Sequence, residues 1–78
     1  MNDDIQQELA MLHEALKVEG VESFEMRDEG AYIFLYAVQG INSCSKAVTA
    51  AKALGYTASY VYHYMIGDKP ASSMSLKK

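Results

Sequence analysis

The stretch AYIFLYAVQGINSCSKAVTAAKALGYTASYVYHYMI, residues 31–66, decides the fold. Its first part, residues 31–38, and its last part, residues 56–66, are rich in aromatic and β-branched residues, which favours two strands. Between them a Gly-Ile-Asn-Ser turn precedes a helical pattern of small residues that Gly55 closes. A strand, a helix of about 12 residues and a second strand form a crossover, so we expect the two strands to run parallel in one sheet.

The residues before this stretch predict a helix and a hairpin. Apolar residues recur at helical spacing from Ile5 to Leu16, which indicates an amphipathic helix over residues 3–19. Residues 21–27 alternate between polar and apolar side chains, as a half-buried strand does. Asp28-Glu29-Gly30 is typical of a turn, so the chain should return into the next strand as a hairpin.

The length of this turn sets which face of the second strand is buried, because a shift of one residue turns every side chain over. An even loop places Phe24, Met26, Ile33 and Leu35 on one face. An odd loop pairs Phe24 with Phe34 and inverts the second strand. Turn chemistry favours the odd loop, whereas polarity favours the even one, since it leaves the tyrosines beside the charged side chains. We adopt the even register.

These elements predict one α+β domain over residues 1–70, in the order α-β-β-α-β, with a three-stranded sheet packed against two helices. In the last strand, Tyr56 shares a face with Tyr60, Tyr62 and Tyr64 by alternation, and the sequence leaves open which face is buried. Residues 71–78 are serine-rich and basic, so we expect a flexible basic tail or a short edge strand. The segment 32–61 also resembles one half of a SPOR-type peptidoglycan-binding repeat, but it carries no specific motif and implies no function.

Composition and charge exclude several classes of protein. A single cysteine rules out an internal disulfide, and the N-terminus has no signal-peptide pattern, so we expect a cytoplasmic protein. No apolar run approaches the roughly 20 residues that a membrane span requires. Residues 1–30 have a net charge of −7 and residues 31–78 a net charge of +4. The acidic half is a poor match for nucleic acid and a better one for a basic protein partner.

No reaction is predicted from the side chains. Cys44 lies in the first turn of the predicted helix, where the dipole can lower a thiol pKa, and His63 could act as its base. A small thiol-dependent enzyme is therefore one alternative, although a lone cysteine on the contact side of a helix is typically inert packing. The histidines and the cysteine are far apart in sequence, so we expect neither a metal nor a cofactor.

The sequence favours a non-catalytic protein–protein interaction module, such as an adaptor, inhibitor or regulator. Tyrosine suits interfaces because its rigid apolar ring carries a polar tip. The partner would be a larger protein or a second copy of this chain. A sheet that stacks the bases of single-stranded nucleic acid is the other alternative, which the scarcity of lysine near the rings disfavours. The predicted partner-binding residues are the tyrosines Tyr32, Tyr36, Tyr60, Tyr62 and Tyr64 and the carboxylates Glu22, Glu25, Asp28 and Glu29.

Overall fold

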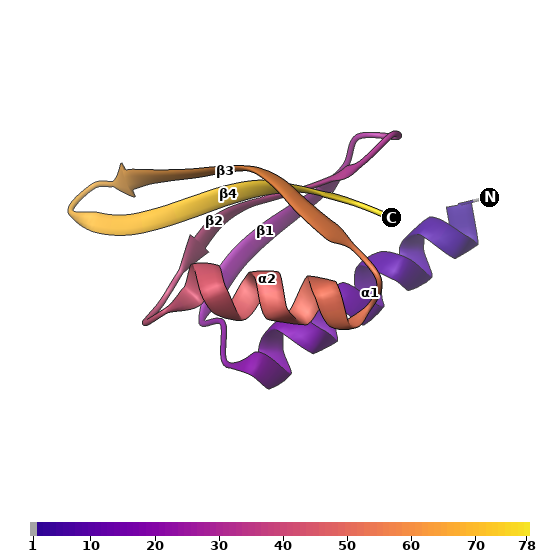
Figure 1. Cartoon of the computed structure of the whole chain (residues 1–78), viewed down its shortest axis with the longest axis horizontal. Coiled ribbons are helices and arrows are strands. Elements are labelled where there is room, and N and C mark those ends of the chain that lie inside the picture. Colours follow the sequence, from indigo (N-terminus) through magenta and orange to yellow (C-terminus); the bar gives the residue numbers. More distant parts are fainter. Residues whose placement is uncertain (1) are drawn as a thin grey trace.

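The computed structural model describes residues 2–78, with side chains from Asp4 onward. Both helices lie on one face of the sheet, as Figure 1 shows, and the molecule is elongated, 39 × 23 × 18 Å. The α+β class expected from the sequence is confirmed. The elements in the described residues are α1 (Asn2–Glu19), β1 (Ser23–Asp28), β2 (Ile33–Gln39), α2 (Ser43–Ala53), β3 (Thr57–Ile66) and β4 (Lys69–Lys77).

The sheet contains one strand more than the three expected. Within residues 2–78 its order is β1-β2-β4-β3, and each neighbouring pair is antiparallel. Because β2 and β3 are both antiparallel to β4, they run in the same direction, as the crossover predicts. They are not neighbours, however, since β4 lies between them.

The extra strand consists of residues expected to form a flexible tail or an edge strand. Residues 71–77 belong to β4, which pairs on both sides, and Ala71 to Met74 are buried. The chain enters β4 through the two-residue loop Gly67-Asp68, which joins Ile66 to its partner Lys69. Pro70 is tolerated because the recorded pairing between β2 and β4 begins only at Ser72, beyond the proline.

The hairpin of β1 and β2 has the even register. Met26 lies opposite Leu35 and Asp28 opposite Ile33, so the loop contains four residues. The even register as first drawn would pair Met26 with Ile33, so the observed pairs are displaced by two residues. A displacement of two residues leaves the same side chains on each face of the hairpin. Ile33 and Leu35 are buried beneath the helices, and Phe24 and Met26 pack against the same core.

Two β-bulges interrupt the alternation of side chains. Ala37 in β2 and Tyr60 in β3 have positive φ angles of 53° and 51°, and the register shifts beside each of them. The bulge in β3 corrects the expectation that Tyr56 shares a face with Tyr62. Tyr56 is buried in the core on the helix side, whereas Tyr62 lies on the other face of the sheet.

The helix α2 packs closely on the sheet because its contact side is made of small residues. Ala47, Ala50 and Ala51 are buried, and Cys44 and Val48 pack against the core beside them. The chain enters α2 through Asn42, which has a left-handed backbone and makes no side-chain capping bond. The core below the sheet is therefore closed by α1 and α2, and the face away from the helices stays open (Figure 1).

Candidate interaction surface

The open face of the sheet brings together side chains from all the described strands. Residues directly opposite each other in antiparallel strands point to the same side, and Phe34 lies opposite both Arg27 and Ser75. The pairing of Tyr62 with Ser73 continues the same face into β3. We call this surface the ring face, defined by Arg27, Tyr32, Phe34, Tyr36, Tyr60, Tyr62, Tyr64, Ser73, Ser75 and Lys77.

Two rings of β2 form its centre. Phe34 and Tyr36 stack with their centroids 5.1 Å apart and their planes 14° from parallel. The Arg27 guanidinium lies 5.7 Å from the centroid of each ring. A cation over aromatic faces is attracted by their quadrupoles, so this arginine holds the pair in place on the sheet surface.

The ring of Tyr64 bridges the middle of the sheet. Its hydroxyl accepts a hydrogen bond of 2.9 Å from the backbone N–H of Ala37, which the bulge of β2 turns away from the ladder. To reach it from β3, the ring must cross β4 above Ala71, its direct partner. Small residues in β4 make this crossing possible. The bond restrains Tyr64, which limits its freedom to adapt to a partner.

Strand β3 is the most exposed apolar part of the surface. The exposed fraction is 76% for Tyr60, 63% for Tyr62 and 58% for Met65, and Val61 and Ile66 are exposed as well. In the part of the chain that the structure describes, no strand pairs with the outer edge of β3. Figure 1 shows that the hairpin of β3 and β4 extends past the N-terminal end of α2, so the helices do not cover its tip.

A hollow of about 360 Å³ opens beside these rings. Tyr32 lines it from the loop before β2, Tyr60 and Tyr62 line it from β3, and Lys77 lines it from β4. Three of the predicted tyrosines therefore line one hollow. Lys77 lines it as well, and the sequence interpretation did not include this residue. The space is broad enough for an inserted side chain of a partner.

The predicted carboxylates do not form one patch. Asp28 accepts a hydrogen bond of 2.9 Å from the backbone N–H of Gly30, and Glu29 forms an ion pair of 2.9 Å with Arg27. Glu22 precedes the opposite end of β1, roughly 20 Å away at about 3.3 Å per residue. Glu25 lies opposite Tyr36, beside the ring pair. Two of the four carboxylates thus stabilise the hairpin itself.

Cys44 and His63 occupy different surroundings. The Cys44 side chain packs against the core, whereas the His63 Nδ1 atom lies 3.1 Å from the Ser72 hydroxyl oxygen. A hollow of about 300 Å³ beside His63 is lined by Ser43 and Ser72, and Cys44 is not among the described residues that line it. Ser72 is 4% exposed and belongs to the central strand, which leaves its hydroxyl little room to attack a substrate.

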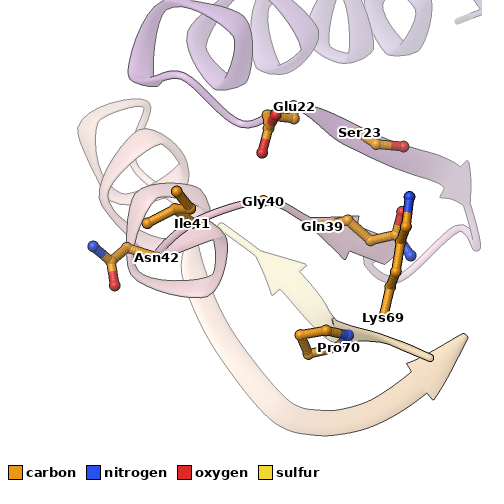
Figure 2. A pocket seen from close by; sticks show the side chains of 8 residues that line it. All are labelled: Glu22, Ser23, Gln39, Gly40, Ile41, Asn42, Lys69 and Pro70. Atoms are coloured by element: carbon orange, nitrogen blue, oxygen red, sulfur yellow. The ribbon is translucent and has the colours of Figure 1, made fainter.

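A hollow of about 620 Å³ lies at the end of the sheet near Gly40 (Figure 2). Glu22 leans over Gly40 from one side, and Lys69 extends toward Gln39 from the other. The residues around it are exposed or half-buried. Opposite charges on exposed side chains, with no buried polar group among the described residues between them, do not define a ligand.

The sequence interpretation did not include Arg27 and Lys77 among the partner-binding residues. The even register already places Arg27 with Glu25 on the tyrosine side, but its contact with the rings of Phe34 and Tyr36 does not follow from the pattern. Lys77 could not be placed without recognising β4. The signal for β4 was the Gly67-Asp68 pair, a typical two-residue hairpin loop that follows a strongly predicted strand.

Within residues 2–78 no group of side chains is suited to a metal. Among the described residues no three His, Cys, Asp or Glu side chains gather in a way that could hold an ion. None of the helices in the described part of the chain is long and apolar enough to cross a membrane. Comparison of the chain with protein-family models, curated proteins and solved structures gives no significant match.

Proposed function

We propose that this chain is a non-catalytic protein-docking module whose contact surface is the outer edge of β3 and the rings beside it. The observation that carries the proposal is the exposure of Tyr60, Tyr62 and Met65 on an edge strand whose outer backbone groups pair with no other strand in the described residues. Contiguous apolar exposure of this kind is typical of interaction sites. Free N–H and C=O groups along the same edge can add a strand from a partner.

The composition of β3 supports this proposal. Its ten residues, TASYVYHYMI, include no lysine, arginine, aspartate, glutamate or proline. Proteins commonly protect an exposed edge with such residues, because an unprotected edge pairs with other chains. The bulge at Tyr60 is the one protective feature that β3 has, and it leaves Tyr62–Ile66 as a straight segment.

The carboxylates support a docking role less strongly. Glu29 is paired with Arg27, and Asp28 is bonded to the hairpin turn. We therefore assign the contact to the rings and the edge. The acidic charge of residues 1–30 then acts mainly on solubility and on the choice of a partner.

Affinity capture from the native lysate tests the proposal. The immobilised wild type should retain a protein that the Tyr60→Ser/Tyr62→Ser variant does not, because two exposed rings of the contact are removed. The matched control is Val18→Ser/Ile41→Ser, which removes two apolar side chains that are more than 75% exposed elsewhere on the molecule. Equal capture by the wild type and both variants would contradict the proposal.

A second candidate function, binding of single-stranded nucleic acid, is favoured by two cations on the ring face. Arg27 covers the Phe34–Tyr36 pair, and Lys77 lines the hollow with Tyr32 and Tyr62. Stacking platforms of this kind combine aromatic rings with backbone-binding cations.

An oligonucleotide titration at low salt separates the two functions. Binding of bases should quench tyrosine fluorescence, weaken as salt is added and weaken further in Lys77→Ala. Unchanged fluorescence at low salt would remove the second candidate and leave protein docking in place.

A further inference from the structure

We infer that the partner docked on β3 is a second copy of this chain, paired antiparallel so that two sheets join into one continuous sheet. The inference rests on the proposed docking function and names its partner. The related strand at the other edge, β1, carries Glu25, Arg27 and Asp28 within six residues. A second copy paired at β1 would have to match these charges one by one, whereas two copies of β3 meet without any lysine, arginine or carboxylate.

The continuity of the ring face selects the antiparallel arrangement. Both copies present the outer edge of β3, because its other edge is paired with β4. An antiparallel pair of these edges keeps the two ring faces on the same side of the joined sheet. A parallel pair of the same edges would turn one copy over and place its ring face on the opposite side.

The straight segment of β3 fixes the register. Directly opposite residues must lie on the same face of the joined sheet. Tyr62, Tyr64 and Ile66 of one copy must therefore lie opposite members of the same set in the other copy. The two-fold axis then passes beside Tyr64, the middle residue of Tyr62–Ile66, and sets Tyr62 opposite the partner's Ile66. A shift by one residue would place Tyr62 opposite Met65 and turn the ring faces to opposite sides.

This arrangement also separates the charged β1 strands of the two copies. The joined sheet has β1 at both outer edges, with the two β3 strands at its centre. Seven strand spacings of about 4.8 Å put the two β1 strands about 34 Å apart. Electrostatic repulsion is screened over about 10 Å at 0.1 M salt, so the charges of the two β1 strands hardly act on each other.

Sedimentation equilibrium at micromolar concentration tests the inference with a matched pair of variants. In Tyr62→Lys/Ile66→Lys, lysines of the two copies face each other twice, and the dimer should dissociate to half its mass. In Tyr62→Lys/Ile66→Glu, the same positions form two opposite-charge pairs, and the dimer should persist. Within one copy the two positions are about 13 Å apart along the strand, so the variants differ little as monomers.

A disulfide gives a second measurement that does not depend on added charge. In the Cys44→Ser background, Tyr64→Cys should form a covalent dimer on mild oxidation. Opposite Cα atoms in antiparallel strands lie about 4.5–5.5 Å apart, which is within the range of a disulfide. Tyr62→Cys, which faces the partner's Ile66, should cross-link much less.

The outcomes distinguish this inference from the docking function. A monomeric wild type, or a Lys/Lys variant as dimeric as the wild type, would overturn the second copy as the partner. If that monomer still captures another protein through the rings, the docking function stands. If it captures nothing, both fail. A wild-type dimer that only the Lys/Lys variant loses would establish the inference.

Discussion

The hydroxyl of Tyr56 is buried without a hydrogen-bond partner among the described residues. Its ring packs in the core, and the Lys78 ammonium lies 5.1 Å from the ring centroid while donating a 3.1 Å hydrogen bond to Glu8. A buried hydroxyl without a partner has lost its bonds to water and gained none in return. Burial raises the pKa of Tyr56 above its usual 10.0, the charge of Glu8 raises it further, and Lys78 acts in the opposite direction.

Tyr56→Phe should therefore raise the free energy of unfolding at neutral pH by about 1 kcal/mol, because it removes the unpaired polar atom and keeps the ring. Urea unfolding followed by circular dichroism measures the change. Tyr62→Phe, at an exposed position, should leave stability within about 0.5 kcal/mol of the wild type. A loss of more than 1 kcal/mol in Tyr56→Phe would show that the hydroxyl is satisfied in solution.

The raised pKa of Tyr56 predicts that the stability of the fold depends on pH in the alkaline range. The pKa of Tyr56 is higher in the folded than in the unfolded chain, so its contribution is fully present below pH 10.0 and is lost as the pH rises through the folded value. The wild type should lose stability above pH 10.0 more steeply than Tyr56→Phe. Thermal melts of both proteins over the alkaline range would reveal this, and parallel pH profiles would contradict it.

Gly40 has a positive φ angle and also lies close to the side chain of Glu22. Its φ is +125°, and an added Cβ would lie 2.8 Å from Glu22 Oε2 and 3.2 Å from Glu22 Cγ (Figure 2). Gly30 has a φ of +88° with nothing within 4 Å, so it isolates the backbone cost.

Gly40→Ala should destabilise the protein by roughly 1–3 kcal/mol, and by more than Gly30→Ala. In a Glu22→Ala background the cost of Gly40→Ala should fall, because part of the contact is gone. Denaturant midpoints of the four variants measure this. A cost that does not change with Glu22 would mean that backbone strain alone matters.

At the scale of elements, periodicity in the sequence located the helices and the first strands, because each shows a clear apolar pattern. It did not locate β4, where Ser72, Met74 and Leu76 face the core and alternate with Ala71, Ser73 and Ser75. Such a strand has few large apolar residues. The small side chains on its open face are explained by neighbouring rings, such as that of Tyr64, which crosses above it. That explanation requires the order of the strands, which local patterns do not contain.

The central position of β4 gives a direct prediction for Met74, a fully buried side chain. Met74→Ala should cost about 2–5 kcal/mol, because it leaves a cavity between the sheet and the helices. Met11→Ala, at a position that is 54% exposed, should change stability by less than about 0.5 kcal/mol. Chemical unfolding of both variants measures the difference. A cost below 1 kcal/mol for Met74→Ala would be inconsistent with a central β4.

The positions of the two bulges could not be predicted from the sequence either. Tyr60 and Ala37 adopt left-handed backbone conformations that such residues rarely take, and no turn residue marks either site. The bulge at Tyr60 moves Tyr56 into the core and keeps Tyr62 on the open face. The candidate tyrosines could thus be chosen by residue type, but their separation into buried and exposed rings depends on one local irregularity.

At the scale of the whole molecule, the order α-β-β occurs twice, and the sheet order β1-β2-β4-β3 gives both halves an equivalent outer edge. β1 and β3 therefore occupy equivalent positions at the two edges of the sheet, and they differ in their sequences. The edge at β1 is short and charged, whereas the edge at β3 is long, uncharged and bordered by exposed rings. This contrast is the physical basis for assigning the contact to β3.

Amide hydrogen exchange compared at low and high protein concentration tests that assignment most directly. The backbone amides of Tyr62–Ile66 should exchange more slowly as concentration rises, because pairing with a second copy protects them, while the amides of Ser23–Asp28 should not change. Exchange in β3 that is independent of concentration, or slowing in β1 instead, would contradict the pairing of two copies through β3.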